Sequence, residues 1–440
     1  MNPRLLPLLL GALLAPALPA QHADTALAHP LTLGDAIRLA SRLNAQAQEA
    51  RERAAAASAR VTQRRSEILP EFDATALESG RTLNAQTFGF PGLDSAFLLG
   101  PVNSLDLRLH AVVPLVNIAS YKRISASKAD AAASSADAAS IGETAGQVGA
   151  AAYVRVQRAE ALVTARLADS VLADSLLDIA RDQLRSGVGV AIDVTRAQVQ
   201  LSTVRAQLIA QRAERDRSRL EFLRALDLPL DTRFALADSL DRLEPSKETP
   251  AESASVALAL TTRPDIRAAQ MQLEASQTAV SSIKAERIPS LGAAGDWGSS
   301  GVNGSTALNT FTWGIQLSLP IFDGLRREGR IEEEEAGVRE SRTRLNALVQ
   351  QASIEVRAAI VDLVAAREFL GAARERLELS QLEVQQARER FVAGVAGNLD
   401  VITASSNLNT SRSQLVEALA SYQDARVSLA RAEGTVTSLP

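Results

Sequence analysis

The chain contains one segment twice, and this internal repeat restricts its possible folds more than any other feature. Residues 181–208 align without a gap with residues 388–415, and the copies share a glycine, Gly187 in one and Gly394 in the other. An Asp-Val pair follows each glycine after the same interval. Chance similarity between two alanine-rich helices does not readily explain these matches together. The pattern therefore predicts two copies of one structural unit.

The repeat also extends upstream of these segments. Pro70 and Pro289 each follow a helical pattern and precede an extended one, and Pro114 and Pro320 each end a second extended stretch. Each half then runs helix, strand, loop, strand, long helix, glycine turn, helix. We expect the two repeats at 31–247 and 252–440, joined by the polar linker 244–250.

Each repeat contains a stretch without proline that is too long for an ordinary globular helix. No proline occurs between Asn117 and Ser186 or between Asp323 and Ala393, and both stretches are rich in good helix formers. At 1.5 Å per residue, each would form a helix about 100 Å long. Three glycines within 142–149 weaken the first helix and permit a bend there.

Apolar and small residues recur three and four apart along these helices, which is the seam pattern of a coiled coil. Each repeat also has two shorter predicted helices, one before its strands and one after its glycine turn. Placed end to end, these two helices would nearly match the length of one long helix. They lie at about 44–66 and 193–226 in the first repeat and at about 264–287 and 400–434 in the second. The acidic run 332–335 is interpreted as a solvated helix face. The seam positions are Val194, Ala197, Leu201, Val204 and Leu208; Val356, Ala359, Leu363, Ala366, Leu370, Ala373 and Leu377; and Val401, Ala404, Leu408, Ser411, Leu415, Ala418, Tyr422, Ala425 and Leu429.

Four segments alternate between apolar and polar residues over about ten positions, as membrane-spanning strands do. A soluble hairpin packed on a helix would look the same. Four strands cannot close a barrel, and unpaired edges are not tolerated in lipid, so several copies would have to associate. The strands are predicted at about 70–80, 104–114, 290–298 and 310–320, with exposed loops at 80–103 and 299–309.

The N-terminus has the pattern of a secretory signal peptide, which we place at residues 1–23. Arg4 supplies positive charge, an apolar run of about ten residues follows it, and small residues come next. No later apolar stretch approaches the roughly 20 residues that a transmembrane helix needs. We therefore expect an exported protein that enters a membrane, if at all, as strands.

Composition argues against several functional classes. The 47 basic and 51 acidic residues nearly balance, which gives no electrostatic case for a nucleic-acid partner. The chain has no cysteine, and its three histidines are His22, His29 and His110. No nucleophile motif, metal-ligand spacing or paired catalytic set is present, so we expect no catalytic residue, no metal site and no cofactor.

In the order and spacing of these features, the chain resembles the TolC family of outer-membrane factors over nearly its whole mature length. The resemblance implies a mainly α fold with membrane β-structure. Three protomers with four strands each would form a twelve-stranded β-barrel in the outer membrane, continued by an α-barrel tunnel of long coiled-coil helices across the periplasm. Such homotrimers are passive exit ducts of tripartite efflux pumps or type I secretion systems. Their partners are a periplasmic adaptor, an inner-membrane pump and outer-membrane lipid.

The glycine turns correspond to the tips that family members use for docking on the adaptor. The matching pairs are Gly187-Val188 and Gly394-Val395. A purely structural interpretation is that each glycine ends a helix by adopting positive φ. Both interpretations can hold at once.

Asp400 matches a family aspartate that lines the periplasmic constriction, where one carboxylate from each protomer makes an acidic ring that favours cations. A second aspartate found in some relatives is replaced here by Thr403. Asp193 occupies the equivalent place in the first repeat. The alternative for both aspartates is that they are N-caps of the following helices, and for Asp193 we favour the cap.

The polar latch that closes the tip in some relatives does not carry over. Ala396 replaces its arginine, and Phe391 replaces its tyrosine. Our hypothesis is that a latch in this chain pairs Asp193 with Arg185 or Arg196, or that the tip is held more loosely.

A periplasmic coiled-coil adaptor or scaffold protein is the main alternative to a channel. Such a protein would keep the helical hairpins but would carry compact β domains outside them. Here the strands interrupt the helices at matching places in both halves, which favours the channel.

Overall fold

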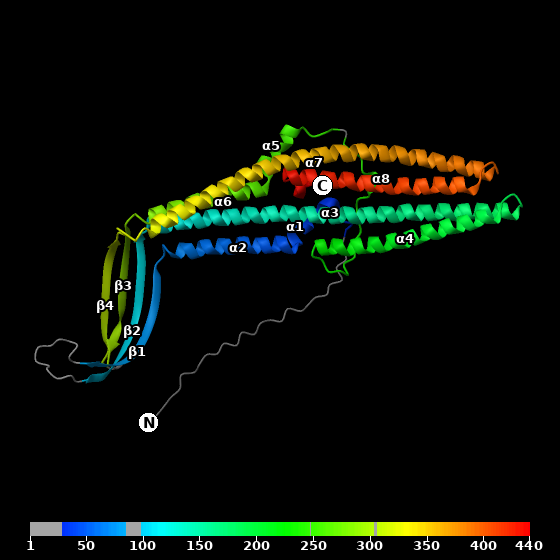
Figure 1. The fold of residues 1–440 in the computed structure, drawn as a ribbon. Helices are drawn as coiled ribbons and strands as arrows, with labels where there is room; N and C mark the ends of the chain where they lie inside the picture. Colours follow the sequence, from blue (N-terminus) through cyan, green and yellow to red (C-terminus); the bar gives the residue numbers. More distant parts are fainter. Residues whose placement is uncertain (1–28, 85–97, 247, 303–305) are drawn as a thin grey trace, which may run out of the picture.

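A computed structural model describes residues 29–84, 98–246, 248–302 and 306–440. The predicted signal peptide, residues 1–23, and the centres of both predicted loops lie outside the described residues. The molecule is elongated, with long helices running side by side from a small sheet at one end to two helical turns at the other (Figure 1).

The two predicted repeats have matching elements in the same order. The long helices are α3 and α7, and each lies beside two shorter helices placed end to end (Figure 1). The first half has α2 (Ala45–Ser66), β1 (Glu71–Asn84), β2 (Leu98–Val116), α3 (Ile118–Arg185) and α4 (Ala191–Ala225); the second has α6 (Pro264–Ala285), β3 (Ser290–Gly301), β4 (Leu308–Ser318), α7 (Arg326–Val392) and α8 (Asn398–Glu433).

The predicted coiled-coil seams lie where the helices pack on one another. In α8 all the seam residues except Leu415 are buried, and Leu415 packs against the core as a half-buried side chain. The seams of α4 and α7 are also buried or half-buried throughout. Because many seam residues are alanine or serine, the helix backbones can approach closely. The seam prediction is confirmed.

A short helix that the sequence patterns did not predict, α1 (Leu33–Leu43), packs across the middle of α3. The glycines that permitted a bend in α3 instead make room for this helix. A Cβ atom added to Gly149 would lie 2.4 Å from the Ala40 Cβ, and one added to Gly146 would lie 3.1 Å from the Ile37 Cγ2. The long helix α3 continues through both glycines without interruption.

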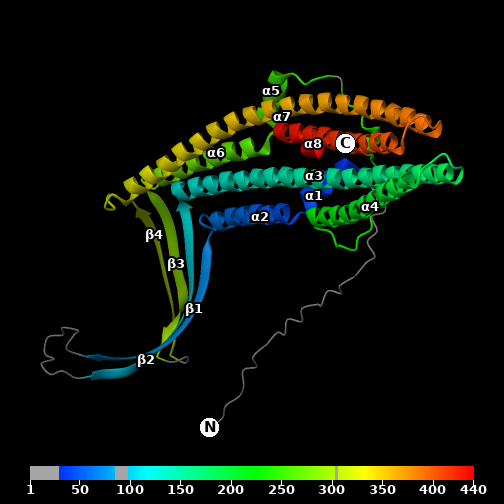
Figure 2. The ribbon, with the colours of Figure 1, turned by 45° about the vertical axis from the view of Figure 1, so that its right-hand side comes forward.

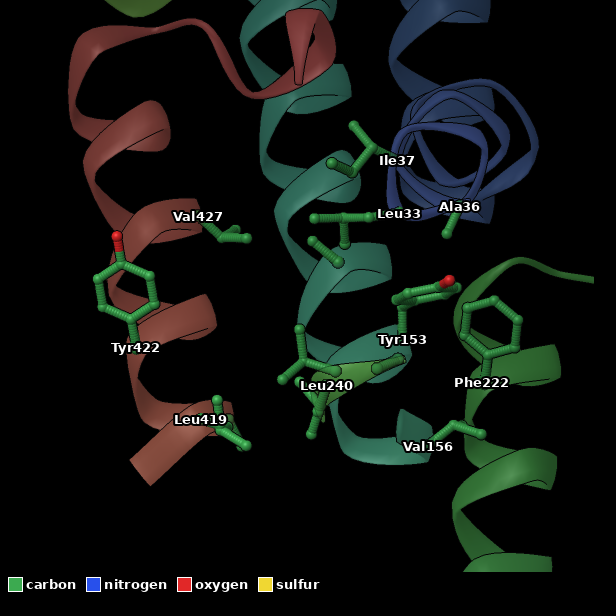
Figure 3. Close-up of a cluster of buried hydrophobic side chains, with 14 of the residues drawn as sticks. Leu33, Ala36, Ile37, Tyr153, Val156, Phe222, Leu240, Leu419, Tyr422 and Val427 are labelled. Carbon is green, nitrogen blue, oxygen red and sulfur yellow. The ribbon is translucent and has the colours of Figure 1, made fainter. Parts of the chain in front are cut away.

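The principal core forms where α1, α3, α4 and α8 meet the segment that joins the two halves (Figure 3). Tyr153 is fully buried there, and its single hydroxyl proton lies between two acceptors, the Leu31 carbonyl at 2.9 Å and the Asp238 carboxylate at 3.0 Å from the hydroxyl oxygen. Burial raises the pKa of this phenol above its ordinary value. The Phe222 ring packs edge-on against Tyr153.

The joining segment follows this core and leads into the second half. Leu236 of this segment, which follows α4, forms a β-bridge with Leu31, which lies just before the start of α1, and Leu240–Arg242 form the 3-10 turn η2. A further helix, α5 (Glu252–Thr262), packs on α7 and α8, and the 3-10 turn η3 (Val436–Ser438) packs near α1. The joining segment crosses the long helices near the level where α2 and α4 meet, and α5 lies beside α7 (Figure 1).

The strands form one antiparallel sheet in the order β1-β2-β3-β4. β1 and β2 remain paired as far as Asn84 and Leu98, so much of the predicted loop 80–103 is strand and that part of the prediction is wrong. The predicted loop 299–309 is likewise shortened by strand at both ends. Alternating hydrophobicity marks only the part of a strand that has one apolar face. Backbone pairing continues beyond that part wherever the two strands stay adjacent.

One face of the sheet carries large apolar side chains, and they are exposed. Residues paired across adjacent strands share a face, so the register places these side chains together. The members are Phe72, Leu107, Leu109, Trp297, Phe311, Trp313, Ile315 and Leu317. A water-soluble sheet would cover such a face, so this one is suited to an apolar environment.

Among the described residues, no helix is both long enough and apolar enough to cross a membrane.

Candidate functional site

The candidate site lies at the end of the molecule farthest from the sheet, where the α3–α4 and α7–α8 hairpins turn side by side (Figure 2). Both turns have the same backbone hydrogen bonds. After α3, Val188 N–H donates to the Gln183 carbonyl at 3.1 Å; after α7, Val395 N–H donates to the Arg390 carbonyl at 3.0 Å. This is the Schellman arrangement, which satisfies carbonyls at a helix end.

The backbone conformation of these turns favours glycine at one position in each. Gly187 has φ 80° and Gly394 has φ 70°, and a Cβ atom at either position would meet nothing within 4 Å. The positive φ alone therefore favours glycine, as the structural interpretation predicted. The next residues are highly exposed, at 80% for Val188 and 74% for Val395. Each tip thus presents an uncovered apolar side chain.

The two aspartates that follow the turns are not N-caps, contrary to our prediction for Asp193. The N-cap residues are Val190 and Gly397, and neither makes a side-chain capping bond. Asp193 and Asp400 lie in the first turn of α4 and α8, because each helix begins sooner after the Schellman turn than the Asp-Val pattern suggested. Carboxylates in this position are still favoured by the helix dipole.

Asp400 and Thr403 are exposed and lie about one helical turn apart on α8. The Thr403 hydroxyl donates to the Leu399 carbonyl at 2.9 Å, so it is held against its own helix. The Asp193 side chain is more covered, with 16% of it exposed. The second repeat therefore presents its polar residues to solvent more fully than the first.

The structure brings together only one of the two predicted latch pairs. Arg196 Nη1 lies 3.7 Å from Asp193 Oδ1 in the same helix. Arg185 instead pairs with Asp182 on α3. Both pairs join residues of one helix, so neither ties one hairpin to the other.

The two hairpins are joined at the tip by contacts that the sequence patterns did not reveal. Phe391 is buried in an apolar cluster that includes Leu176 and Leu201. The residue that replaces the latch tyrosine of some relatives therefore contributes apolar packing in this chain. The Gln183 amide donates to the Phe391 carbonyl at 2.9 Å, and the Asn398 amide donates to the Asp193 carbonyl at 2.7 Å. Apolar packing and amide bonds therefore hold the tip of the protomer.

A buried carboxylate joins the hairpins farther from the tip. The Asp169 side chain on α3 has no exposed surface and accepts hydrogen bonds from Arg412 at 2.6 Å and Arg166 at 3.1 Å. Arg166 also donates to the Ser413 hydroxyl at 2.9 Å. The sequence signal that could have found this contact is the repeat match between Arg412 and Arg205, since both arginines bond to α3.

In the part of the chain that the structure describes, no group of three or more histidine and carboxylate side chains is arranged to hold a metal ion.

The chain matches the family described as "Outer membrane efflux protein" over residues 36–227 and 256–435. It is 24% identical over 292 residues to the outer membrane efflux protein BepC of Brucella suis, in an alignment covering 66% of this chain and 62% of that protein. It is 28% identical over 282 residues to the toluene efflux pump outer membrane protein TtgF of Pseudomonas putida, covering 61% and 56% respectively. The matched region thus spans less than two thirds of either relative.

Solved structures share the fold over almost the entire chain. The outer-membrane channel OprN superposes with a TM-score of 0.75 at 21% identity, covering 92% of this chain and 90% of that one. The outer membrane protein VceC of Vibrio cholerae superposes with a TM-score of 0.75 at 18% identity, covering 91% and 96%. The mainly helical fold with its four-stranded sheet is therefore that of known channels.

These matches confirm the resemblance to TolC-like proteins and favour a channel over the coiled-coil adaptor or scaffold alternative. The family consists of channel proteins rather than enzymes. The match to the family covers both helical hairpins and both strand pairs. The chain therefore belongs to the outer membrane efflux protein family and is located in the outer membrane.

Proposed function

We propose that three copies of this chain form a passive exit channel across the outer membrane and the periplasm. The observation that carries this proposal is the sheet, whose exposed face is apolar and whose outer strands β1 and β4 each have an unpaired edge. Pairing β4 of one copy with β1 of the next removes every edge, as a lipid environment requires. With four strands per copy, three copies give a closed barrel of twelve strands.

The helices support the second half of the passage. α3 has 68 residues and α7 has 67, so each spans about 100 Å at 1.5 Å per residue. Arranged around the same axis as the barrel, three copies would enclose a tunnel that extends through the periplasm and ends at the glycine turns. The energy for transport would come from a partner, because a conduit of this kind has no energy source.

The system we favour is a tripartite efflux pump, with type I secretion as the alternative. BepC is named as an efflux protein and TtgF as a toluene efflux pump component, and these names support the first choice. A periplasmic adaptor would dock on the tips at Gly187-Val188 and Gly394-Val395, and an inner-membrane pump would act through it. The exposed valines supply the apolar contact for the adaptor.

The docking proposal predicts that Val188→Asp combined with Val395→Asp abolishes transport while leaving the channel intact. Charge on the exposed apolar tips would oppose their burial against an adaptor, and neither side chain is needed for packing within the protomer. A deletion strain is first screened for a toxic compound to which it is hypersensitive. The double variant should then fail to restore tolerance, although its amount in the outer membrane equals that of the wild type.

The matched control is Val188→Ala combined with Val395→Ala, which keeps the tips apolar and should restore tolerance. If the aspartate variant restores tolerance as fully as the wild type, adaptor docking through these residues is excluded.

The constriction proposal predicts that the purified protein forms cation-selective pores in planar bilayers and that Asp400→Asn weakens this selectivity severalfold. Asp400 is exposed on α8, and one carboxylate from each copy would form an acidic ring around the axis. Asp193→Asn should have a smaller effect because its side chain is largely covered. The reversal potential in a KCl gradient gives the measurement. A protein that forms no trimer and no pore would contradict the proposed function itself.

A further inference from the structure

One row of side chains across the sheet contains a histidine between two carboxylates. In the strand register, His110 of β2 pairs with Asp73 of β1 on one side and with Asp296 of β3 on the other, and Asp296 pairs with Thr312 of β4. Residues paired in this way lie on the same face of a sheet. All four strands therefore contribute a polar side chain to one level, and His110 is the only histidine in the described strands.

The histidine and one of its neighbours are in direct contact. His110 Nδ1 lies 2.7 Å from Asp296 Oδ1, and the two side chains are 36% and 33% exposed. The pair is therefore well formed yet open to water and ions. Its small neighbours on this face include Gly298 beside Arg108 and Gly314 beside Ala294, which cannot cover it.

The remaining charges on this face do not neutralise the row. Arg108 lies two residues from His110 on β2 and on the same face, but it is 2.9 Å from Asp106 on the same strand, so its charge is already balanced. Glu71 of β1 lies two residues before Asp73 on the same face and adds a further negative charge. The net charge at this level is consequently set by the two aspartates and by the protonation state of the imidazole.

This face is the one that would surround the passage. The opposite face carries both tryptophans, Phe72, Phe311 and a row of exposed aliphatic residues, which would contact lipid in the proposed trimer, whereas the His110 face is mixed and has exposed apolar side chains such as Leu77 and Val112 among its polar residues. Side chains of a membrane barrel alternate between lipid and lumen, and substitutions on the lumen side alter selectivity. In three copies the row would become a ring of six carboxylates and three imidazoles, because each copy contributes one histidine and two aspartates.

We propose that His110, with Asp73 and Asp296, forms a selectivity ring in the strand segment that makes the ion preference of the channel depend on pH. With neutral imidazole, each copy presents the charges of two carboxylates; with imidazolium, one of these charges is offset. This inference rests on the proposed trimeric channel and adds a second charged ring, far from the constriction at Asp400. Histidine is the side chain that ordinarily changes charge between pH 5 and 8, which sets the range for the test.

The test measures the potassium-to-chloride permeability ratio of the purified full-length protein in planar bilayers of phosphatidylcholine. All proteins carry Asp400→Asn, so that the carboxylate at the tip does not contribute. Between pH 8 and pH 5.5, the ratio should fall about two- to threefold as the ring loses negative charge. His110→Asn should show no such fall, since asparagine stays neutral throughout. His29→Asn is the matched control and should retain the full pH dependence.

Two further variants keep the result interpretable. His110→Gln is a second neutral substitution should the asparagine variant fold poorly, and it should also abolish the pH dependence. Asp296→Asn should lower the ratio at pH 8, because it removes one carboxylate from each copy. A His110→Gln channel with the same pH dependence as its parent would overturn the selectivity ring and leave the channel proposal standing. Absence of conductance in every protein, including the wild type without Asp400→Asn, would overturn both proposals.

Discussion

Gly298→Ala is expected to reduce the amount of folded protein in the outer membrane by at least about tenfold, because the added methyl group costs about 3 kcal/mol. A Cβ atom at this position would lie 2.1 Å from the Leu107 carbonyl oxygen and 2.8 Å from the Arg108 Cα. Both are backbone atoms of the paired strand β2, so no side-chain rotation can relieve the overlap. The β2–β3 pairing would have to open at the centre of the sheet.

The chain offers a closely matched control for this substitution. Gly314 of β4 lies on the same face of the sheet, and a Cβ atom there would meet nothing within 4 Å. Gly314→Ala should therefore give nearly the wild-type amount of folded protein. Outer-membrane fractions can be compared on gels by the difference in migration of heated and unheated samples. Equal yields of the two variants would show that β2 and β3 can separate locally at little cost.

Arg263→Ala is expected to destabilise the helical part of the molecule by about 3–5 kcal/mol, the usual cost of removing one partner from a buried ionic group. The Arg263 side chain is only 3% exposed. Its guanidinium lies 2.6 Å from the Asp265 carboxylate and 2.5 Å from that of Glu355, and it also donates to the Ala432 carbonyl at 3.3 Å. One side chain thus joins the start of α6 to α7 and to the end of α8.

Removing Arg263 would leave the Asp265 and Glu355 carboxylates without the guanidinium that both of them contact, and only the more remote charge of Arg431 would act on Asp265. The close approach of Gly434 limits any rearrangement, since a Cβ atom there would lie 2.8 Å from the Arg263 Cα and its φ is 74°. Arg267→Ala, about one turn further along α6, is the control because that side chain is exposed. Guanidinium unfolding followed by circular dichroism should show a lower midpoint for Arg263→Ala only. Similar midpoints for both variants would show that the carboxylates find solvent instead.

The effect of Arg263→Ala should also depend on pH. Burial by itself would raise the pKa of the Asp265 carboxyl, but the hydrogen bonds and charge of Arg263 hold it below its ordinary value of 3.8. A carboxyl whose pKa is lower in the folded state stabilises the fold above the unfolded pKa, and this contribution is lost as pH falls through the folded value. The stability difference between wild type and variant should therefore be largest near neutral pH and shrink below about pH 4.

Local sequence patterns predicted most of the architecture. The repeat around Gly187 and Gly394, the absence of proline from the long helices and the three- and four-residue spacing of apolar side chains each reflect a constraint within one element. The same applies to the alternation that located the strands. These properties are determined by backbone geometry and by which face must leave water, so they can be read from neighbouring residues alone.

Only part of the candidate site could be predicted from neighbouring residues in the sequence. The glycine turns were located correctly, because positive φ and helix termination are local properties. The N-cap interpretation of Asp193 was wrong, because the hydrogen bonds of the turn decided where α4 begins. The contacts that hold the tip, such as Asn398 with the Asp193 carbonyl, join residues that are far apart in the chain.

The sequence by itself determined that this chain would form two long hairpins with four strands between their helices, and which residues would turn at the tips. Only the tertiary structure decided that Gly146 and Gly149 make room for α1, that Asp169 binds Arg412, and that His110 lies between Asp73 and Asp296. The physical reason is that a helix or strand follows from its own residues, whereas a buried ion pair or a cross-strand row depends on the register of elements separated by long stretches of chain.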